Sequence, residues 1–116
     1  MPLPLDAQSW PDPLDPGEVK DYEVDFSDVL VSGETITDKT ISIADEPNAP
    51  GLAVDSPAAT LINGDTAVKL WASVASASQS DGAYAGPGIE AGVTVNITTS
   101  DSRTYEKTCG LTIRQR

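Results

Sequence analysis

Short runs of alternating apolar and polar residues, separated by turn residues, most restrict what this chain can fold into. Such alternation turns one face of a strand toward the core and the other toward water. About seven such runs follow one another after residue 17, and no window has a helical period. Evenly spaced strands with turns between them are typical of a sandwich of two sheets. We therefore predict an all-β, immunoglobulin-like β-sandwich of about seven antiparallel strands.

The clearest runs stand near the two ends of this region. Tyr22, Val24 and Phe26 share one face of the first run, and acidic residues share the other face. Residues 92–100 and 103–116 are alternating runs separated by a Ser-Asp-Ser turn. A short turn between two such runs predicts an antiparallel hairpin at the end of the chain.

One run departs from strict alternation. Ile41 and Ile43 share a face, whereas Ile36 is out of phase with them. One extra residue in a strand restores the phase by forming a bulge. We predict such a bulge near Asp38 and Lys39.

Residues 1–17 form a separate compositional unit, and we predict an extended Pro-rich arm there, followed by a single β-sandwich domain over residues 18–116. Prolines exclude a helix and a regular central strand from this segment. The prolines are Pro2, Pro4, Pro11, Pro13 and Pro16. A terminus without fixed structure and an arm that docks on this domain or on another chain both fit the composition. Trp10 favours docking, because Trp is a common interface anchor.

The charge of the chain excludes some partners. Its 18 acids and 7 bases give a formal net charge of −11, whereas binding to nucleic acid or anionic membranes needs clustered Lys and Arg. Residues 1–65 carry 14 acids and 2 bases, a balance of −12, and residues 66–116 carry 4 acids and 5 bases, a balance of +1. This asymmetry fits a solvated acidic face or head-to-tail contacts between copies, which generate rings or filaments.

Catalytic and metal-binding residues are hard to find in this sequence. It has no histidine, the most common general base and transition-metal ligand. Cys109 is in phase with apolar residues of its strand, which predicts a buried, inert thiol. The acids of residues 21–28 follow one strand and its end, as on a solvated edge, and no run matches a calcium-binding EF-hand loop. We predict no enzyme activity, no metal and no cofactor.

The location of the protein is also constrained. With one cysteine, the chain cannot form an internal disulfide. No apolar run has the length of a signal sequence or a membrane span. We therefore expect synthesis in the cytoplasm of the producing cell.

Two stretches of the chain carry motifs of a known family. DPGEVKDYEVDFSDVLVSGETI (15–36) and VTVNITTSDSRTYEKTCGLTIRQR (93–116) resemble the phage fibre–tail adaptor proteins, a group of small virion proteins of tailed phages. The matching residues of the first stretch are Asp15, Pro16, Glu18, Asp21, Tyr22, Asp25, Phe26, Ser27, Asp28, Gly33 and Ile36. Those of the second stretch are Ile97, Thr98, Thr99, Ser100, Arg103, Thr104, Leu111, Ile113 and Arg116.

The resemblance covers residues 15–75 and 92–116 and departs from the family pattern in four places. Phe26 stands where Trp is usual, and Ser102 where Gly is usual. The small-residue segment 76–91, whose residues 76–88 we expect to be a long flexible loop, is longer than in the family. Residues 1–14 have no counterpart.

The resemblance implies a virion structural protein, made in the host bacterial cytoplasm, that acts as an adaptor at the tail or the head–tail neck. Its partners would be copies of itself in a ring or symmetric assembly and other tail, neck or fibre proteins. A capsid decoration protein and a glycan-binding module are the alternatives. Deleting residues 1–14 should then weaken assembly and leave the fold intact. The expected partner-binding residues are Trp10, Pro11, Pro13, Leu14, Trp71, Tyr84, Arg103, Arg114 and Arg116.

Overall fold

The computed structural model describes residues 8–43, 49–55 and 58–115, and in these residues the chain is all-β as predicted. Two single-turn 3₁₀ helices, η2 (Ser76–Ser78) and η3 (Gly82–Tyr84), accompany the strands. The strands are β1 (Gln8–Ser9), β2 (Val19–Asp25), β3 (Ile36–Ile43), β4 (Leu52–Ala53), β5 (Thr60–Ile62), β6 (Ala67–Val74), β7 (Ile89–Thr99) and β8 (Thr104–Ile113). No helix in this described part is long and apolar enough to cross a membrane.

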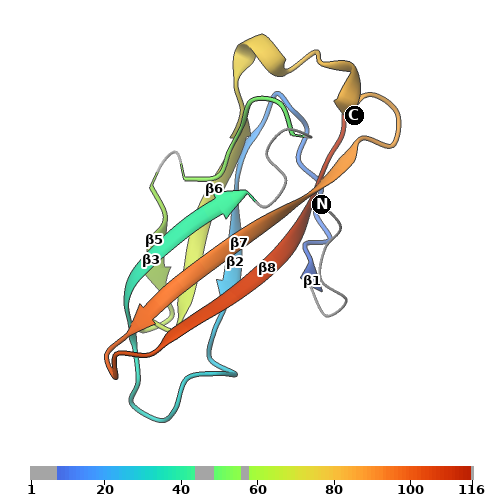
Figure 1. Cartoon of the computed structure of the whole chain (residues 1–116). Coiled ribbons are helices and arrows are strands. Elements are labelled where there is room, and N and C mark those ends of the chain that lie inside the picture. The colour runs from blue at the N-terminus through green and yellow to red at the C-terminus, as the bar shows by residue number, and fades with distance from the viewer. Residues whose placement is uncertain (1–7, 44–48, 56–57, 116) are drawn as a thin grey trace.

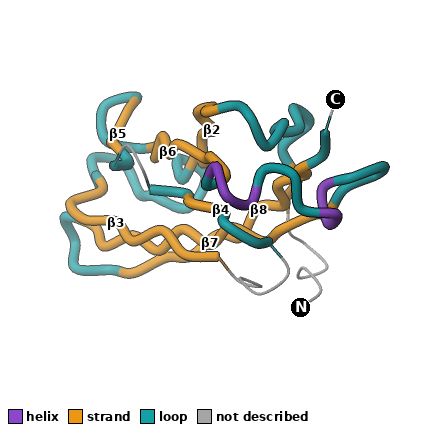
Figure 2. The backbone as a smooth tube through the Cα atoms, turned by 90° about the horizontal axis from the view of Figure 1, so that it is seen from above, coloured by secondary structure: helices purple, strands orange, loops and turns teal. Residues whose placement is uncertain are grey.

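The strands form two sheets (Figure 1). One sheet has the order β1-β8-β7-β3, and the other has the order β2-β6-β4, with β5 also paired to β6. Seven of the strands pair antiparallel, and β1 pairs parallel to β8. Seen from above, β3 and β7 lie on the opposite side of the molecule from β5, β6 and β2 (Figure 2).

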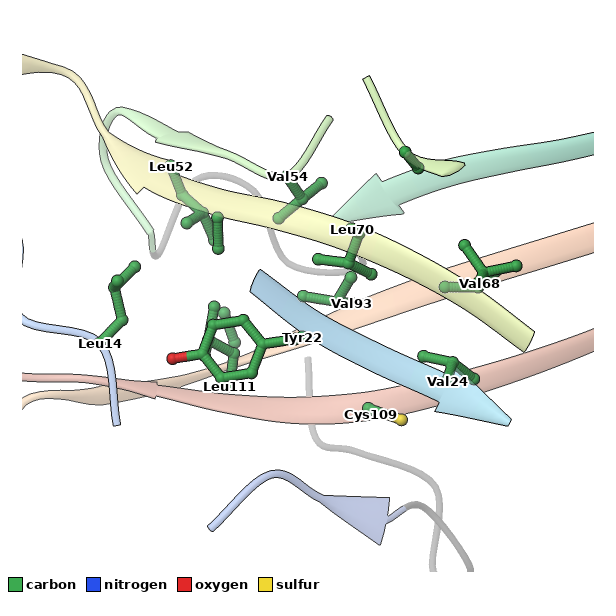
Figure 3. Packing of buried hydrophobic residues seen from close by; sticks show 14 of the residues in the cluster. Leu14, Tyr22, Val24, Leu52, Val54, Val68, Leu70, Val93, Cys109 and Leu111 are labelled. Carbon is green, nitrogen blue, oxygen red and sulfur yellow. The ribbon is translucent and has the colours of Figure 1, made fainter. Parts of the chain in front are cut away.

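Buried side chains of both sheets meet in a single hydrophobic cluster (Figure 3). Alternate residues of each long strand point into it, because successive side chains of a strand point to opposite faces. The cluster includes Tyr22 and Val24 of β2, Val68 and Leu70 of β6, Val93 and Val95 of β7, and Cys109 and Leu111 of β8. Burial raises the pKa of the Cys109 thiol, as expected for an inert cysteine.

The strand patterns read from the sequence are confirmed. Phe26, which ends the first alternating run, is fully buried, and Tyr22 and Val24 of that run are buried as well. The pairing of β7 with β8 from Thr98 and Thr104 onward forms the predicted hairpin. The register of β3 on β7 shifts between Ile36 and Asp38, which places the bulge next to its predicted position.

The described part of the arm lies along the outer edge of β8. The backbone N–H of Trp10 donates to the carbonyl of Gly110 at 3.0 Å, and the N–H of Leu14 donates to that of Thr112 at 2.9 Å. Leu14 is fully buried in the hydrophobic cluster. Deleting residues 1–14 would therefore remove a core side chain, so the expectation that the fold survives this truncation intact is revised.

The segment between β6 and β7 is anchored by Tyr84, whose side chain is fully buried. The Tyr84 hydroxyl donates to the carbonyl of Pro50 at 2.5 Å, and the N–H of Gln115 donates to the Tyr84 carbonyl at 2.8 Å. Figure 1 shows this segment at the opposite end of the molecule from the β7–β8 turn. The sequence indicated a long loop here, and the structure adds two turns of 3₁₀ helix and a core anchor.

Candidate interaction surfaces

The two motif stretches that lie far apart in the sequence meet at the β7–β8 turn. The N–H of Ser100 donates to the carbonyl of Thr35 at 2.8 Å, and the Thr35 N–H donates to Ser100 Oγ at 3.0 Å. Glu34 is buried beside them, although it is charged. The Thr99 hydroxyl donates to Glu34 Oε2 at 2.5 Å, and Arg103 Nη1 lies 3.4 Å from Glu34 Oε1. We call Glu34, Thr99 and Arg103 the Glu34 lock.

The contacts of the Glu34 lock stabilise the ionised form of the Glu34 carboxyl group. The hydrogen bond from Thr99 is the largest influence that lowers the pKa of Glu34, followed by the bond from the Val31 N–H, and Arg103 adds its charge. Burial acts in the other direction and is outweighed. Hydrogen bonds to the charged form of a carboxyl group favour that form. Since Glu34 lies in the loop after β2, and Thr99 and Arg103 lie at the β7–β8 turn, the lock joins this loop to the hairpin.

Stability should therefore fall as Glu34 becomes protonated. A carboxyl with a lowered folded-state pKa stabilises the fold fully above its unfolded pKa, and this contribution is lost as the pH falls toward the folded pKa. We expect the melting temperature of the wild type to drop more steeply below about pH 4.5 than that of Glu34→Gln, which keeps the side-chain shape. Thermal unfolding followed by circular dichroism at a series of pH values measures both. Glu106→Gln, at an exposed position of β8, is the matched control, and parallel curves for wild type and Glu34→Gln would contradict this account.

A second junction holds the loop after β2 to β8. Lys107 Nζ lies 2.6 Å from Asp28 Oδ1 and donates to the carbonyl of Asp25 at 2.8 Å. It also lies 5.4 Å from the ring centroid of Phe26. The hydrogen bond from Lys107 lowers the pKa of Asp28. This base is therefore engaged inside its own chain.

Other motif residues build turns. Asp15 Oδ1 accepts from the N–H of Gly17 at 2.8 Å, and Glu18 Oε1 accepts from the N–H of Asp15 at 2.9 Å, which fixes the entry into β2. Ser102 has φ of 62°, in the left-handed region that favours glycine. This backbone conformation gives a physical reason for glycine at that position in the family pattern. The motif residues therefore support the fold, and none of these contacts forms a catalytic arrangement.

A comparison with protein families gives a match over most of the chain, including the residues of these contacts. The family model for podophage GP4 fiber-tail adaptor protein gp77 matches residues 14–112. The chain belongs to this podophage fiber-tail adaptor family. A search of curated proteins finds no match. Membership implies a structural adaptor of the phage tail that binds other virion proteins, is located in the virion and has no catalytic role.

Among the partner-binding residues expected in the arm of this adaptor, the structure covers some and exposes others. Trp10 is half-buried: its ring lies 4.9 Å from that of Tyr22, and its Nε1 donates to the carbonyl of Glu23 at 2.9 Å. Pro11 is exposed and Pro13 is half-buried. Leu14 has no exposed surface in this conformation, so we assign it to the core of the domain.

The other expected residues are spread over the molecule and form no common site. Tyr84 is fully buried, so it too belongs to the core. Arg103 is half-exposed but already pairs with Glu34, and its Nη1 also lies 3.4 Å from Asp101 Oδ2. Arg114 is exposed just after β8. Arg116 lies outside the described residues.

Trp71 lies half-buried on the outer face of the sheet formed by β2 and β6. Directly opposite residues of paired strands share a face, and Trp71 is opposite Asp21 of β2 and Asp55. Lys69 Nζ lies 5.3 Å from the ring centroid of Trp71 and 3.6 Å from Asp21 Oδ2. Val19, with 59% of its surface exposed, shares the same phase of β2.

Sequence reasoning identified Trp71 and missed Val19 and the Glu34 lock. Val19 could have been noticed as the one apolar residue in a phase of β2 whose other members, Asp21, Glu23 and Asp25, are acids. The signal for Glu34 is weaker, since an acid in a turn is ordinarily solvated. In the described residues, no group of three or more potential His, Cys, Asp or Glu ligands could hold a metal ion.

Proposed function

We propose that this protein connects fibre and tail components of a podophage particle, at the tail or at the head–tail neck. The single observation that supports this most is the family match over residues 14–112. The match covers the first motif stretch and residues 93–112 of the second, which the Glu34 lock joins. An adaptor has to hold its binding surfaces in fixed positions, and the lock fixes the loop after β2 on the β7–β8 hairpin. A rigid connector fits this arrangement.

We further propose that the two sheets form an immunoglobulin-like sandwich over residues 18–116, with residues 1–17 as an extended arm. The single hydrophobic cluster shared by both sheets supports one domain. The contacts of Trp10 and Leu14 support an arm whose second half is fixed on its own domain. Among the described residues of the arm, the exposed Pro11 would then be available for contacts with another subunit.

The partners that we propose are other virion proteins of the tail, neck or fibre, and further copies of this chain in a ring or symmetric assembly. The formal charge of −11 disfavours nucleic acid and anionic membranes as partners. A glycan-binding role would need exposed aromatic rings beside polar groups, for which Trp71 and Tyr84 were the candidates in the sequence, and Tyr84 is buried. A capsid decoration role differs from the adaptor role in particle location.

Immunogold labelling of intact particles tests this proposal. With antibodies against this chain, we expect label at the tail or the head–tail junction and the chain in purified particles by mass spectrometry. Particles treated with non-immune antibodies are the control. Label spread over the capsid would replace the adaptor role by decoration, and particles without the chain would overturn a virion role altogether.

A further inference from the structure

The outer face of the β2–β6 sheet combines an aromatic ring with acids. We call Val19, Asp21, Lys69 and Trp71, with Asp55 beside them, the Trp71 face. Asp21 and Asp55 lie opposite Trp71 in register on its two sides. Both aspartates are exposed, and Lys69 is the one base of the Trp71 face. The face therefore has an excess of negative charge around a partly exposed indole.

This face already holds a cation. The ammonium group of Lys69 lies 5.3 Å from the ring centroid of Trp71, within the range of a cation–π interaction, and 3.6 Å from the Asp21 carboxylate. Its side chain is 32% exposed, so the contact is open to competition from solvent and from other cations. A guanidinium is better suited to this position, because it stacks on aromatic rings and binds a carboxylate through two N–H groups.

Arg114 is presented on a fixed backbone at the end of β8. Its N–H donates to the carbonyl of Leu14 at 3.0 Å, and the N–H of Gln115 donates to the carbonyl of Tyr84 at 2.8 Å. The side chain is exposed, and among the described residues it makes no ion pair. By contrast, Arg103 and Lys107 are held by acids of their own chain. Arg114 is therefore the described arginine that remains available to a partner.

We propose that the Trp71 face binds Arg114 of a second copy of this chain. Arg114 follows β8 in one sheet, whereas the Trp71 face is the outer face of the other sheet, so the core separates the two within one molecule. A neighbouring copy can bring them together, with the guanidinium of Arg114 over Trp71 and against Asp21. Because the two surfaces differ, the contact is head-to-tail and closes into a ring when the rotation allows it.

The inference rests on the proposed adaptor function and specifies how its copies would contact one another. The local charges support a second copy as the occupant. Asp21, Glu23 and Asp25 are exposed in the same phase of β2, so the Trp71 face and the strand beside it are acidic. Arg114 is an exposed base without an ion pair among the described residues, so the two sites are complementary in charge and could attract each other despite the net charge of −11.

A charge exchange between two variants tests the contact. Asp21→Arg makes the Trp71 face positive, and Arg114→Asp makes the end of β8 negative. In a solution of either variant alone, the Trp71 face and the end of β8 of a neighbouring copy carry like charges. In a mixture, the positive face of Asp21→Arg can meet the negative end of β8 of Arg114→Asp. We expect wild-type protein to associate at protein concentrations up to about 1 mM. This is the effective concentration of two binding sites that are held together by a short linker, as neighbouring copies in an assembly would be. Each variant alone should bind itself about tenfold more weakly, and the equimolar mixture should recover the association.

Sedimentation velocity over a concentration series gives these dissociation constants, and added salt should weaken the wild-type contact. Glu106→Arg, which makes the same charge change on the exposed outer face of the other sheet, is the control and should associate like the wild type. A monomeric wild type, an Asp21→Arg or Arg114→Asp variant that associates like the wild type, or a mixture without recovery would overturn the inference. Particle labelling at the tail together with any of these results would leave the adaptor function standing and remove only this contact.

Discussion

Replacing Leu14 by alanine is expected to lower the free energy of unfolding by about 2–5 kcal/mol, the usual cost of truncating a buried leucine. The Leu14 side chain is fully buried, and the residue is fixed by hydrogen bonds to the backbone on both sides of Ile113. A domain of this size has only about 5–15 kcal/mol in total, so a large part of its stability depends on one residue of the arm. Urea unfolding followed by tryptophan fluorescence measures the loss.

Val19→Ala is the matched control for Leu14→Ala. It also shortens an aliphatic side chain near the start of the chain, but Val19 has 59% of its surface exposed. We expect a change of about 0.5 kcal/mol or less for this surface position. If the two variants unfold at the same urea concentration, the arm does not dock on its own domain in solution, and the assignment of Leu14 to the core is wrong.

Gly88→Ala is the second change with a large expected effect. A Cβ at Gly88 would lie 2.0 Å from the carbonyl oxygen of Ile113 and 2.6 Å from Cβ of Arg114, and backbone must shift to relieve the first contact. Its φ of 70° adds the strain of a left-handed conformation. Together, the overpacking and the backbone strain should cost about 3 kcal/mol or more. Thermal and urea unfolding would both record this loss.

Gly86→Ala separates the two causes. Gly86 has φ of 61°, but a Cβ there would meet no heavy atom within 4 Å. We expect it to cost about 1–2 kcal/mol from backbone strain alone. Equal losses for the two variants would mean that the close approach of Gly88 to the end of β8 does not persist in solution.

The sequence predicted those parts of the fold that depend on local periodicity. The buried face of β2, with Tyr22 and Val24, and the hairpin of β7 and β8 follow from alternation and turn residues within a few positions. The bulge after Ile36 was also visible as a break in phase. Each of these features is decided by neighbours in the chain.

The parts that the sequence did not predict depend on contacts between distant segments. Tyr84 lies in a stretch of small residues without any period, and its burial depends on Pro50 and Gln115. Glu34 looks like a solvated turn residue until Thr99 and Arg103 are placed beside it. Leu14 lies among prolines that suppress regular structure, so only its pairing with β8 reveals its position in the core.

The candidate site was predictable to a similar extent. Trp71 could be recognised as an aromatic residue in the solvent phase of its strand, and Arg114 as one of the few bases near the C-terminus. Which of those bases are already neutralised could not be recognised. That depends on the positions of Glu34 and Asp28, which come from the first third of the chain.

The pairing of β1 with β8 also determines when the protein can finish folding. Gln8 and Leu14 lie opposite Cys109 and Ile113, about a hundred positions later in the chain. The pocket for Leu14 is therefore incomplete until Ile113 has left the ribosome. Sheets closed by such distant pairings fold in about milliseconds to seconds, because much chain entropy is lost before the contacts form. The arm is thus synthesised before β8, the strand that fixes it, and can be ordered only after β8 is available.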